Sequence, residues 1–95
     1  MPPQLFALYD GGLQGLCRVA RQDAYTCLLT FLEVPAPYRR QGCGSRLLDY
    51  VCRACRPFYQ VLYVSAPADG GAQAFFAACG FSPSRVLPGY LYRKL

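Results

Sequence analysis

The residues with the clearest capacity for chemistry form one short segment, Arg39-Arg40-Gln41-Gly42-Cys43-Gly44. Its two glycines allow close approach of the backbone to a ligand and φ values that other residues avoid. The segment lies directly before a stretch with helical periodicity, and a helix N-terminus offers unpaired N–H groups and a positive dipole end. With the arginines beside them, these features favour binding of a pyrophosphate. An ordinary glycine turn at a helix start is the alternative reading.

Other common motifs for phosphate binding and nucleophilic catalysis are missing from the sequence. The Walker lysine pattern and the Rossmann glycine spacing do not occur. There is no histidine, which excludes Ser-His-Asp and Cys-His nucleophile pairs and histidine-ligated metals. Of the six cysteines only Cys52 and Cys55 form a C-x-x-C pair, so we expect buried thiols and no metal site. Acid–base work then falls to a carboxylate, a tyrosine, a cysteine, water or the substrate.

Length, composition and charge limit the classes of protein to which this chain can belong. A chain of 95 residues with 54% hydrophobic residues fits a single domain, residues 1–95. The net charge of +5 is scattered, and the one dense basic cluster surrounds the glycine segment, so a phosphate-bearing cofactor is favoured and nucleic acid is unlikely. No apolar stretch is long enough for a membrane span and no signal peptide is recognisable, so we expect a cytoplasmic protein.

The elements that must position the glycine segment can be predicted from periodicity and turn residues. Residues 25–34 are apolar at nearly every position, which is typical of a central strand covered on both faces. The order of elements predicts an α/β fold with one mixed sheet and helices packed on its faces. The predicted strands are 5–9, 13–19, 25–34, 60–65, 85–87 and 90–93, and the predicted helices are one from the glycine segment to Pro57 and one over 71–79.

Two spaced motifs resemble the GNAT family of N-acetyltransferases. Arg39-x-x-Gly42-x-Gly44 is similar to the R/Q-x-x-G-x-G/A signature of that family. A second segment, Ala72-x-x-Phe75-Phe76-x-x-Cys79-Gly80-Phe81, resembles the family's N-x-x-A-x-x-F-Y-x-x-x-G-F segment, with Asp69 at the asparagine position. The resemblance covers roughly residues 5–95 and implies a mixed, largely antiparallel GNAT-like sheet.

The resemblance also implies a cofactor, a reaction and a set of binding residues. The cofactor would be acetyl-CoA (coenzyme A), and a substrate amine would attack its thioester directly. The main chain of Leu32 and Val34 would pair with the pantetheine arm, where this strand splays apart from the strand that contains residues 62–64. The pyrophosphate would lie on the glycine segment and its flanks, Arg39, Arg40, Gln41, Gly42, Cys43, Gly44 and Ser45.

The catalytic positions depart from the family pattern. Phe76 occupies the position of the tyrosine that is the proposed acid for the leaving thiolate, and a phenyl ring cannot donate a proton. The carboxylate of histone-type members is also missing, near Leu28. Glu33 and ordered water are the remaining base candidates. Tyr90 and Tyr92 share a face of the last strand, and each is a candidate for lining an acceptor site or acting as a substitute acid. Plain packing and an exposed charge are the alternative readings of Tyr90 and Glu33, and a non-catalytic acyl-CoA-binding module is the alternative function.

Length is the other departure. Family members usually begin with a strand and two helices that shape the acceptor site, whereas this chain begins at the following hairpin. The acceptor pocket is therefore expected to be open or completed by another subunit. Unpaired edges at residues 5–9 and at the aromatic terminal strands predict a homodimer. The expected partners are acyl-CoA and an amine acceptor.

Overall fold

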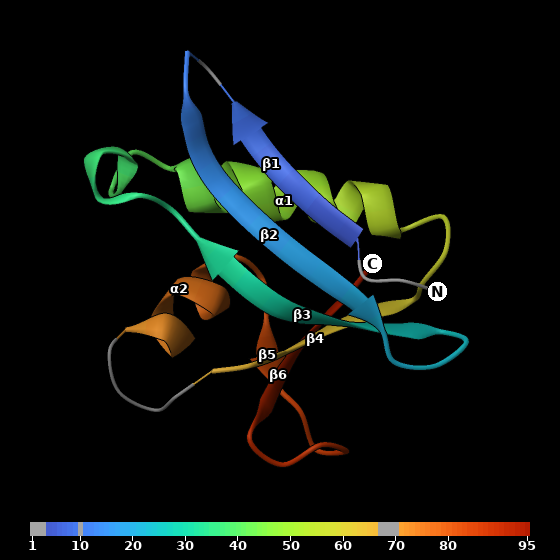
Figure 1. Cartoon of the computed structure of the whole chain (residues 1–95). Helices are drawn as coiled ribbons and strands as arrows, with labels where there is room; N and C mark the ends of the chain where they lie inside the picture. Colours follow the sequence, from blue (N-terminus) through green and yellow to red (C-terminus); the bar gives the residue numbers. More distant parts are fainter. Residues whose placement is uncertain (1–3, 10, 67–70) are drawn as a thin grey trace.

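A computed structural model describes residues 4–9, 11–66 and 71–95 of the chain. Its sheet has six strands in the order β1-β2-β3-β4-β6-β5, antiparallel except for the parallel pair β3–β4 (Figure 1). The predicted mixed, largely antiparallel α/β sheet is confirmed. The elements are β1 (Gln4–Tyr9), β2 (Leu13–Arg21), β3 (Thr26–Glu33), the 3-10 turn η1 (Ala36–Tyr38), α1 (Cys43–Cys55), β4 (Val61–Ser65), α2 (Ala72–Ala78), β5 (Ser82–Pro83) and β6 (Tyr90–Lys94).

The C-terminal strands differ from the prediction. The strand expected at 85–87 is wrong, because the Ser84 hydroxyl accepts hydrogen bonds from the N–H groups of Val86 at 3.2 Å and Leu87 at 3.0 Å and holds this segment in a turn. The paired residues are instead Ser82–Pro83, which form the short edge strand β5. The prediction that the aromatic terminal strand is an edge is therefore also wrong, since β6 lies between β4 and β5.

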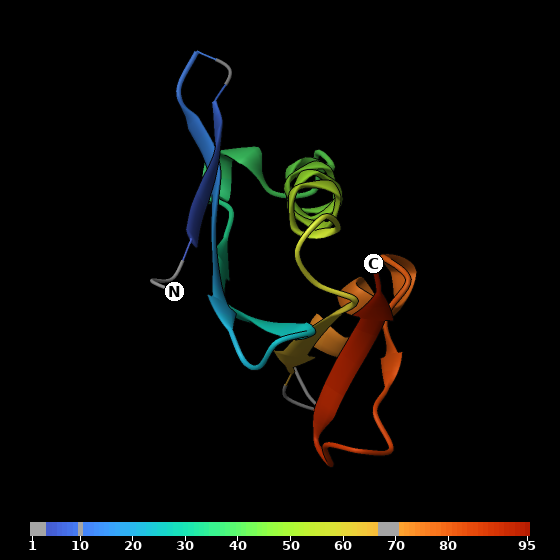
Figure 2. The same cartoon turned by 90° about the vertical axis from the view of Figure 1, so that its right-hand side faces the viewer.

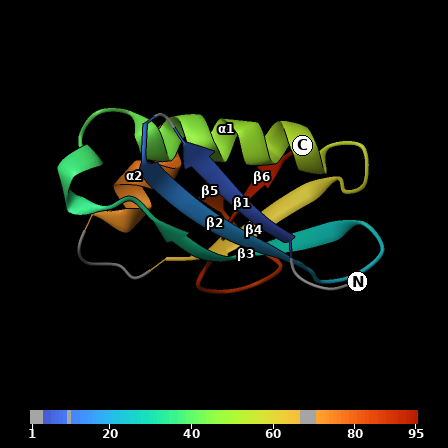
Figure 3. The ribbon, with the colours of Figure 1, turned by 45° about the horizontal axis from the view of Figure 1, so that its top comes forward.

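Both helices pack on one face of the sheet (Figures 2 and 3). In β3, Cys27 and Leu29 point into this core, whereas Leu28 is only half-buried on the opposite face and no described helix packs there. The expectation that β3 is covered on both faces is thus wrong. We call the uncovered side the open face; register and strand alternation place on it Leu28, Phe31, Val61, Tyr63, Ser65, Tyr90 and Tyr92.

Helix α1 begins at the glycine segment and ends shortly before Pro57, as its periodicity predicts. Its outer face carries a surface ion pair, with Arg53 Nη2 lying 3.2 Å from Asp49 Oδ2. Its inner face is buried against the sheet and fixes the position of the glycine segment relative to β3. The buried residues are Cys43, Leu47, Leu48, Val51, Cys52 and Cys55.

Helix α2 ends in a glycine cap that fixes the orientation of Phe76. Gly80 has a φ of +92°, its N–H bonds to Ala77 O at 3.1 Å, and the N–H of Phe81 bonds to Phe76 O at 3.0 Å. The rings of Phe76 and Phe81 meet edge to face with centroids 5.3 Å apart. The Asp69 position of the second motif lies outside the described residues.

No helix among the described residues is long and apolar enough to cross a bilayer.

Candidate coenzyme-binding site

The sheet opens where the parallel pair β3–β4 ends. The two strands are paired only from Thr26 to Leu29 on β3. Beyond that point β3 carries one extra residue, Thr30, because Arg18 pairs with Phe31 while Val19 pairs with Leu29. Such a bulge bends the strand, and β3 and β4 diverge (Figure 1). The resulting cleft has a volume of about 190 Å³ and is lined by Leu29, Thr30, Phe31, Leu32, Val64, Ser65 and Phe76.

The main chain at the end of β3 runs along this cleft. Leu32 pairs with Cys17 and Glu33 with Leu16 on the β2 side, so their side chains point to opposite faces. On the β4 side the strand pairing has already ended at Leu29. The next residue, Val34, has its carbonyl engaged, because Arg39 Nε donates to Val34 O at 2.8 Å. Arg39 therefore ties the glycine segment to the end of β3.

The backbone at the start of α1 forms a cradle of N–H groups. Gly42 is the N-cap with a φ of +80°, and Arg40 has a φ of +62°. The first bond into the helix runs from Arg46 N–H to Gly42 O at 3.0 Å. In the described part of the chain, the N–H groups of residues 40–45 have no hydrogen-bond partner. An exposed row of such groups at a helix N-terminus suits an anion.

Gly44 brings the cradle close to α2. A Cβ at this position would lie 3.2 Å from Phe75 Cζ and 3.6 Å from Val34 Cγ2, so only glycine fits without displacement of its neighbours. Phe75 in turn meets Phe76 edge to face, with ring centroids 5.2 Å apart. Because Phe76 lines the cleft, the cradle and the cleft are linked by two adjacent rings of α2.

The other predicted residues of the segment have structural partners. Cys43 is buried, 3% exposed, and its thiol lies 3.7 Å from Gln14 Oε1, which fits the packing reading of this cysteine. Ser45 Oγ lies 3.7 Å from Cys79 Sγ on the loop after α2. The Gln41 amide donates to Pro37 O at 3.0 Å and closes the turn before the helix. These contacts hold the cradle in one shape.

The two candidate catalytic residues are placed differently. Tyr90 is half-buried and pairs with Ser65, which lines the cleft, so its side chain is on the open face beside the cleft. Glu33 is exposed at the end of β3, past the cleft-lining Leu32. Phe76, only 6% exposed, presents a ring without a donor to the cleft.

Sequence reasoning missed four residues of the cleft, Leu29, Thr30, Phe31 and Ser65. The bulge at Thr30 has no local signature, because it depends on the register of β2 against β3. Ser65 stood out only as the last residue of a predicted strand. Its position next to Tyr90 follows from the pairing of β4 with β6, which the sequence alone does not specify.

Two cysteines of the core, Cys17 and Cys52, are unsuited to act as nucleophiles at this site. Burial raises the pKa of the Cys17 thiol to about 12, and burial likewise raises the pKa of Cys52. Both are neutral at physiological pH and fully enclosed. Across residues 4–9, 11–66 and 71–95, no three groups of the metal-ligating types come together.

The match to a family model assigns the chain to a family. Residues 2–81 match the model of the acetyltransferase (GNAT) family, and the chain belongs to that family. No curated protein sequence matches the chain.

Solved structures of GNAT proteins share the fold across nearly the whole chain. A GNAT family acetyltransferase from Elizabethkingia anophelis with acetyl-CoA bound superposes with a TM-score of 0.84 at 18% identity, covering 98% of this chain and 76% of that one. A GNAT acetyltransferase from Staphylococcus aureus gives 0.81 at 25% identity, covering 98% and 68%. The PaiA N-acetyltransferase from Thermoplasma acidophilum in complex with coenzyme A gives 0.80 at 14% identity, covering 98% and 61%.

Proposed function

We propose that this protein is an acetyl-CoA-dependent N-acetyltransferase that transfers an acetyl group to an amine. The observation that carries the proposal is that a cradle of unpaired N–H groups, at residues 40–45, lies near the cleft where β3 and β4 diverge. Contacts through Gly44, Phe75 and Phe76 link the cradle to the cleft. Family membership supports it, as do the structural relatives described as holding acetyl-CoA or coenzyme A.

Different parts of the chain are proposed to bind different parts of acetyl-CoA. The N–H groups of residues 40–45 bind the pyrophosphate, and Arg40 adds positive charge there. The main chain at Leu32 and the N–H of Val34 pair with the pantetheine arm, since the Val34 carbonyl is already bonded to Arg39. Acetyl-CoA supplies the activated acyl group and a thiol leaving group.

Proton transfer is assigned to the open face. The amine nitrogen bonds to the acyl carbon as the C–S bond breaks, so the amine loses a proton and the thiolate gains one. Tyr90, beside cleft-lining Ser65, is the proposed acid. Glu33 is the proposed base and acts through water, because it lies past the cleft on the same face.

Calorimetric titration with acetyl-CoA, compared with free adenosine nucleotide, tests the coenzyme assignment. Tighter binding of acetyl-CoA followed by thiol release on at least one member of an amine panel is the expected result. Absence of acetyl-CoA binding would refute the proposal.

A second candidate function, a non-catalytic acyl-CoA-binding module, is favoured by one observation, the phenyl ring of Phe76 in the cleft. Phe76→Tyr restores a phenolic donor there, and we expect kcat to rise by roughly tenfold with KM for acetyl-CoA unchanged, since general acid help is worth about 10²–10⁴-fold at most. Phe58→Tyr, which adds the same group to an exposed ring in the turn after α1, is the control. Binding by the natural protein without thiol release on any amine would support the module instead.

We also propose that the protein forms a homodimer through β1, which is the long edge strand of the sheet. Light scattering at micromolar concentration tests it, and a concentration-independent monomer would reject it.

A further inference from the structure

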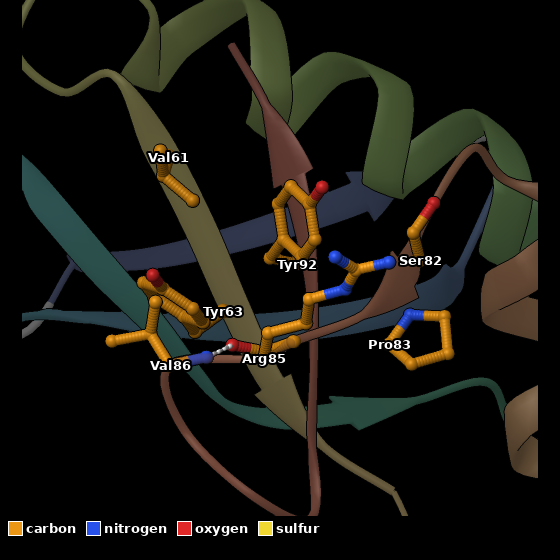
Figure 4. A pocket seen from close by; sticks show the side chains of 8 residues that line it. Val61, Tyr63, Ser82, Pro83, Arg85, Val86 and Tyr92 are labelled. Carbon is orange, nitrogen blue, oxygen red and sulfur yellow. Dashed lines mark hydrogen bonds between the residues drawn. The ribbon is translucent and has the colours of Figure 1, made fainter.

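The open face carries a second, larger pocket that the coenzyme site does not use (Figure 4). It has a volume of about 660 Å³, within the range of roughly 300–1,000 Å³ that is usual for small-ligand sites. It lies between β4, β6 and the loop that joins β5 to β6. The lining residues are Val61, Tyr63, Ser82, Pro83, Ser84, Arg85, Val86 and Tyr92.

The walls combine flat apolar surface with positive charge. The rings of Tyr63 and Tyr92 lie with centroids 6.4 Å apart, and Val86 adds an exposed apolar side chain. The Arg85 side chain extends from the loop toward Tyr92 (Figure 4). Among the described residues the one ion pair is between Arg53 and Asp49, so Arg85 has no carboxylate partner there. A flat apolar molecule with an anionic group fits these walls.

The loop that carries Arg85 is held in shape before any ligand arrives. Ser84 Oγ accepts from the N–H groups of Val86 and Leu87, and Ser84 N–H donates to Tyr90 O at 2.8 Å. The N–H of Tyr90 also donates to Leu87 O at 3.1 Å. Such preorganisation reduces the entropy cost of binding.

The pocket adjoins the cleft along two strands. Tyr63 lines the pocket and Ser65 lines the cleft, and they are successive residues on the open face of β4. They are therefore separated by about 7 Å along the strand, and Val61 lies about 13 Å from Ser65. On β6, Tyr92 and the proposed acid Tyr90 are related in the same way. A molecule that reacts in the cleft can therefore extend into the pocket.

We propose that the pocket binds the body of the acceptor, which is an amine that carries a flat apolar group and an anion at roughly 7–13 Å from the reacting nitrogen. Arg85 pairs with the anion, and Tyr63 and Tyr92 contact the apolar group. Lys94, paired with Val61 on β6, adds a second positive charge at the far end of this face. This inference rests on the proposed acetyl transfer and names its substrate class.

Matched acceptors that differ only in charge test the proposal. The first pair is 4-(aminomethyl)benzoate and its carboxamide, which represent small-molecule acceptors. The second pair is the tripeptide amide Ala-Phe-Glu and its analogue with glutamine in place of glutamate, which represent peptide N-termini. We expect the acidic member of at least one pair to have a kcat/KM about tenfold higher, chiefly through KM. Arg85→Gln should remove this preference, whereas Arg53→Gln, which removes the same charge from the outer face of α1, should preserve it.

Binding without turnover is measured in parallel by NMR titration of the backbone amides. Shifts that concentrate at residues 82–86 and 92 with the benzoate, and not with its amide, are expected even if transfer is slow. The acceptor inference would be overturned if the benzoate and its amide shifted the amide signals of residues 82–86 and 92 equally. It would also be overturned if Arg85→Gln and Arg53→Gln had equal effects on the kcat/KM preference for the acidic acceptor. Acetyl-CoA binding measured on the same samples separates that outcome from failure of the proposed function.

Discussion

The two glycines of the coenzyme segment are required for different physical reasons. Gly42 needs backbone freedom, because its φ is +80° and a Cβ there would meet nothing within 4 Å. Gly44 needs space, because a Cβ would lie 3.2 Å from the Phe75 ring. A side chain at the first position strains the turn before α1, and one at the second pushes α1 away from α2.

Substitution of either glycine should therefore weaken coenzyme binding. We expect Gly42→Val and Gly44→Val each to lower the affinity for acetyl-CoA by at least tenfold in calorimetric titration, since the N–H groups of residues 40–45 no longer converge. Gly89→Val is the matched control for Gly42, because Gly89 also has a positive φ, +84°, and no neighbour within 4 Å, but lies in the β5–β6 turn. If neither Gly42→Val nor Gly44→Val changes the affinity for acetyl-CoA, the assignment of residues 40–45 to coenzyme binding is wrong.

Among the elements, α1 contributes most to the position of the site. Leu47 and Leu48 are 1% and 0% exposed and pack its inner face on the sheet, while the N-terminus of the same helix carries the N–H cradle. The position of the cradle relative to the cleft is thus set by a hydrophobic contact and not by the glycine segment alone.

Truncation of that contact should cost stability. We expect Leu48→Ala to lower the free energy of unfolding by about 2–5 kcal/mol, because it leaves a cavity beneath α1. Arg53→Ala on the outer face of the same helix removes only an exposed ion pair and should cost about 0.5 kcal/mol or less. Urea denaturation of the two variants measures the difference, and similar losses would contradict the assigned orientation of α1.

The sequence predicted those elements best whose cause lies within a few residues. The helical periodicity after the glycine segment is a local pattern, and the helix that it predicts, α1, is confirmed. The turn at residues 84–87 was mistaken for a strand, because the Ser84 hydroxyl bonds that bend it compete with an extended apolar pattern. The bulge at Thr30 depends on pairing between distant segments, which no local pattern reports.

At the scale of the whole molecule, the described chain is a two-layer structure with one enclosed core and one open sheet face. The enclosed layer holds four fully buried thiols, Cys17, Cys27, Cys52 and Cys55, while the open face holds the proposed acid and the acceptor pocket. The proposed proton transfer and acceptor binding are thus assigned to the face opposite the core, whereas the position of the coenzyme cradle depends on the packing of α1 within the core.

The buried thiols give the stability of the protein a defined dependence on alkaline pH. Burial raises the pKa of Cys17 to about 12, whereas an exposed thiol in the unfolded chain titrates near 8.5. The unfolded state therefore loses its proton first, and the stability that this thiol contributes is complete below about pH 8 and falls as the pH rises toward 12.

Comparison of variants isolates this effect from the tyrosines, which titrate in a similar range. Measured by urea denaturation in the presence of a reductant, the stability advantage of the natural protein over Cys17→Ala should shrink by about 2 kcal/mol between pH 8 and pH 10.5. Val19→Ala truncates a neutral core residue on the same face of β2, so its stability deficit should stay constant over that range. A pH-independent deficit for Cys17→Ala would mean that this thiol ionises as readily in the folded core as in water, which its complete burial makes unfavourable.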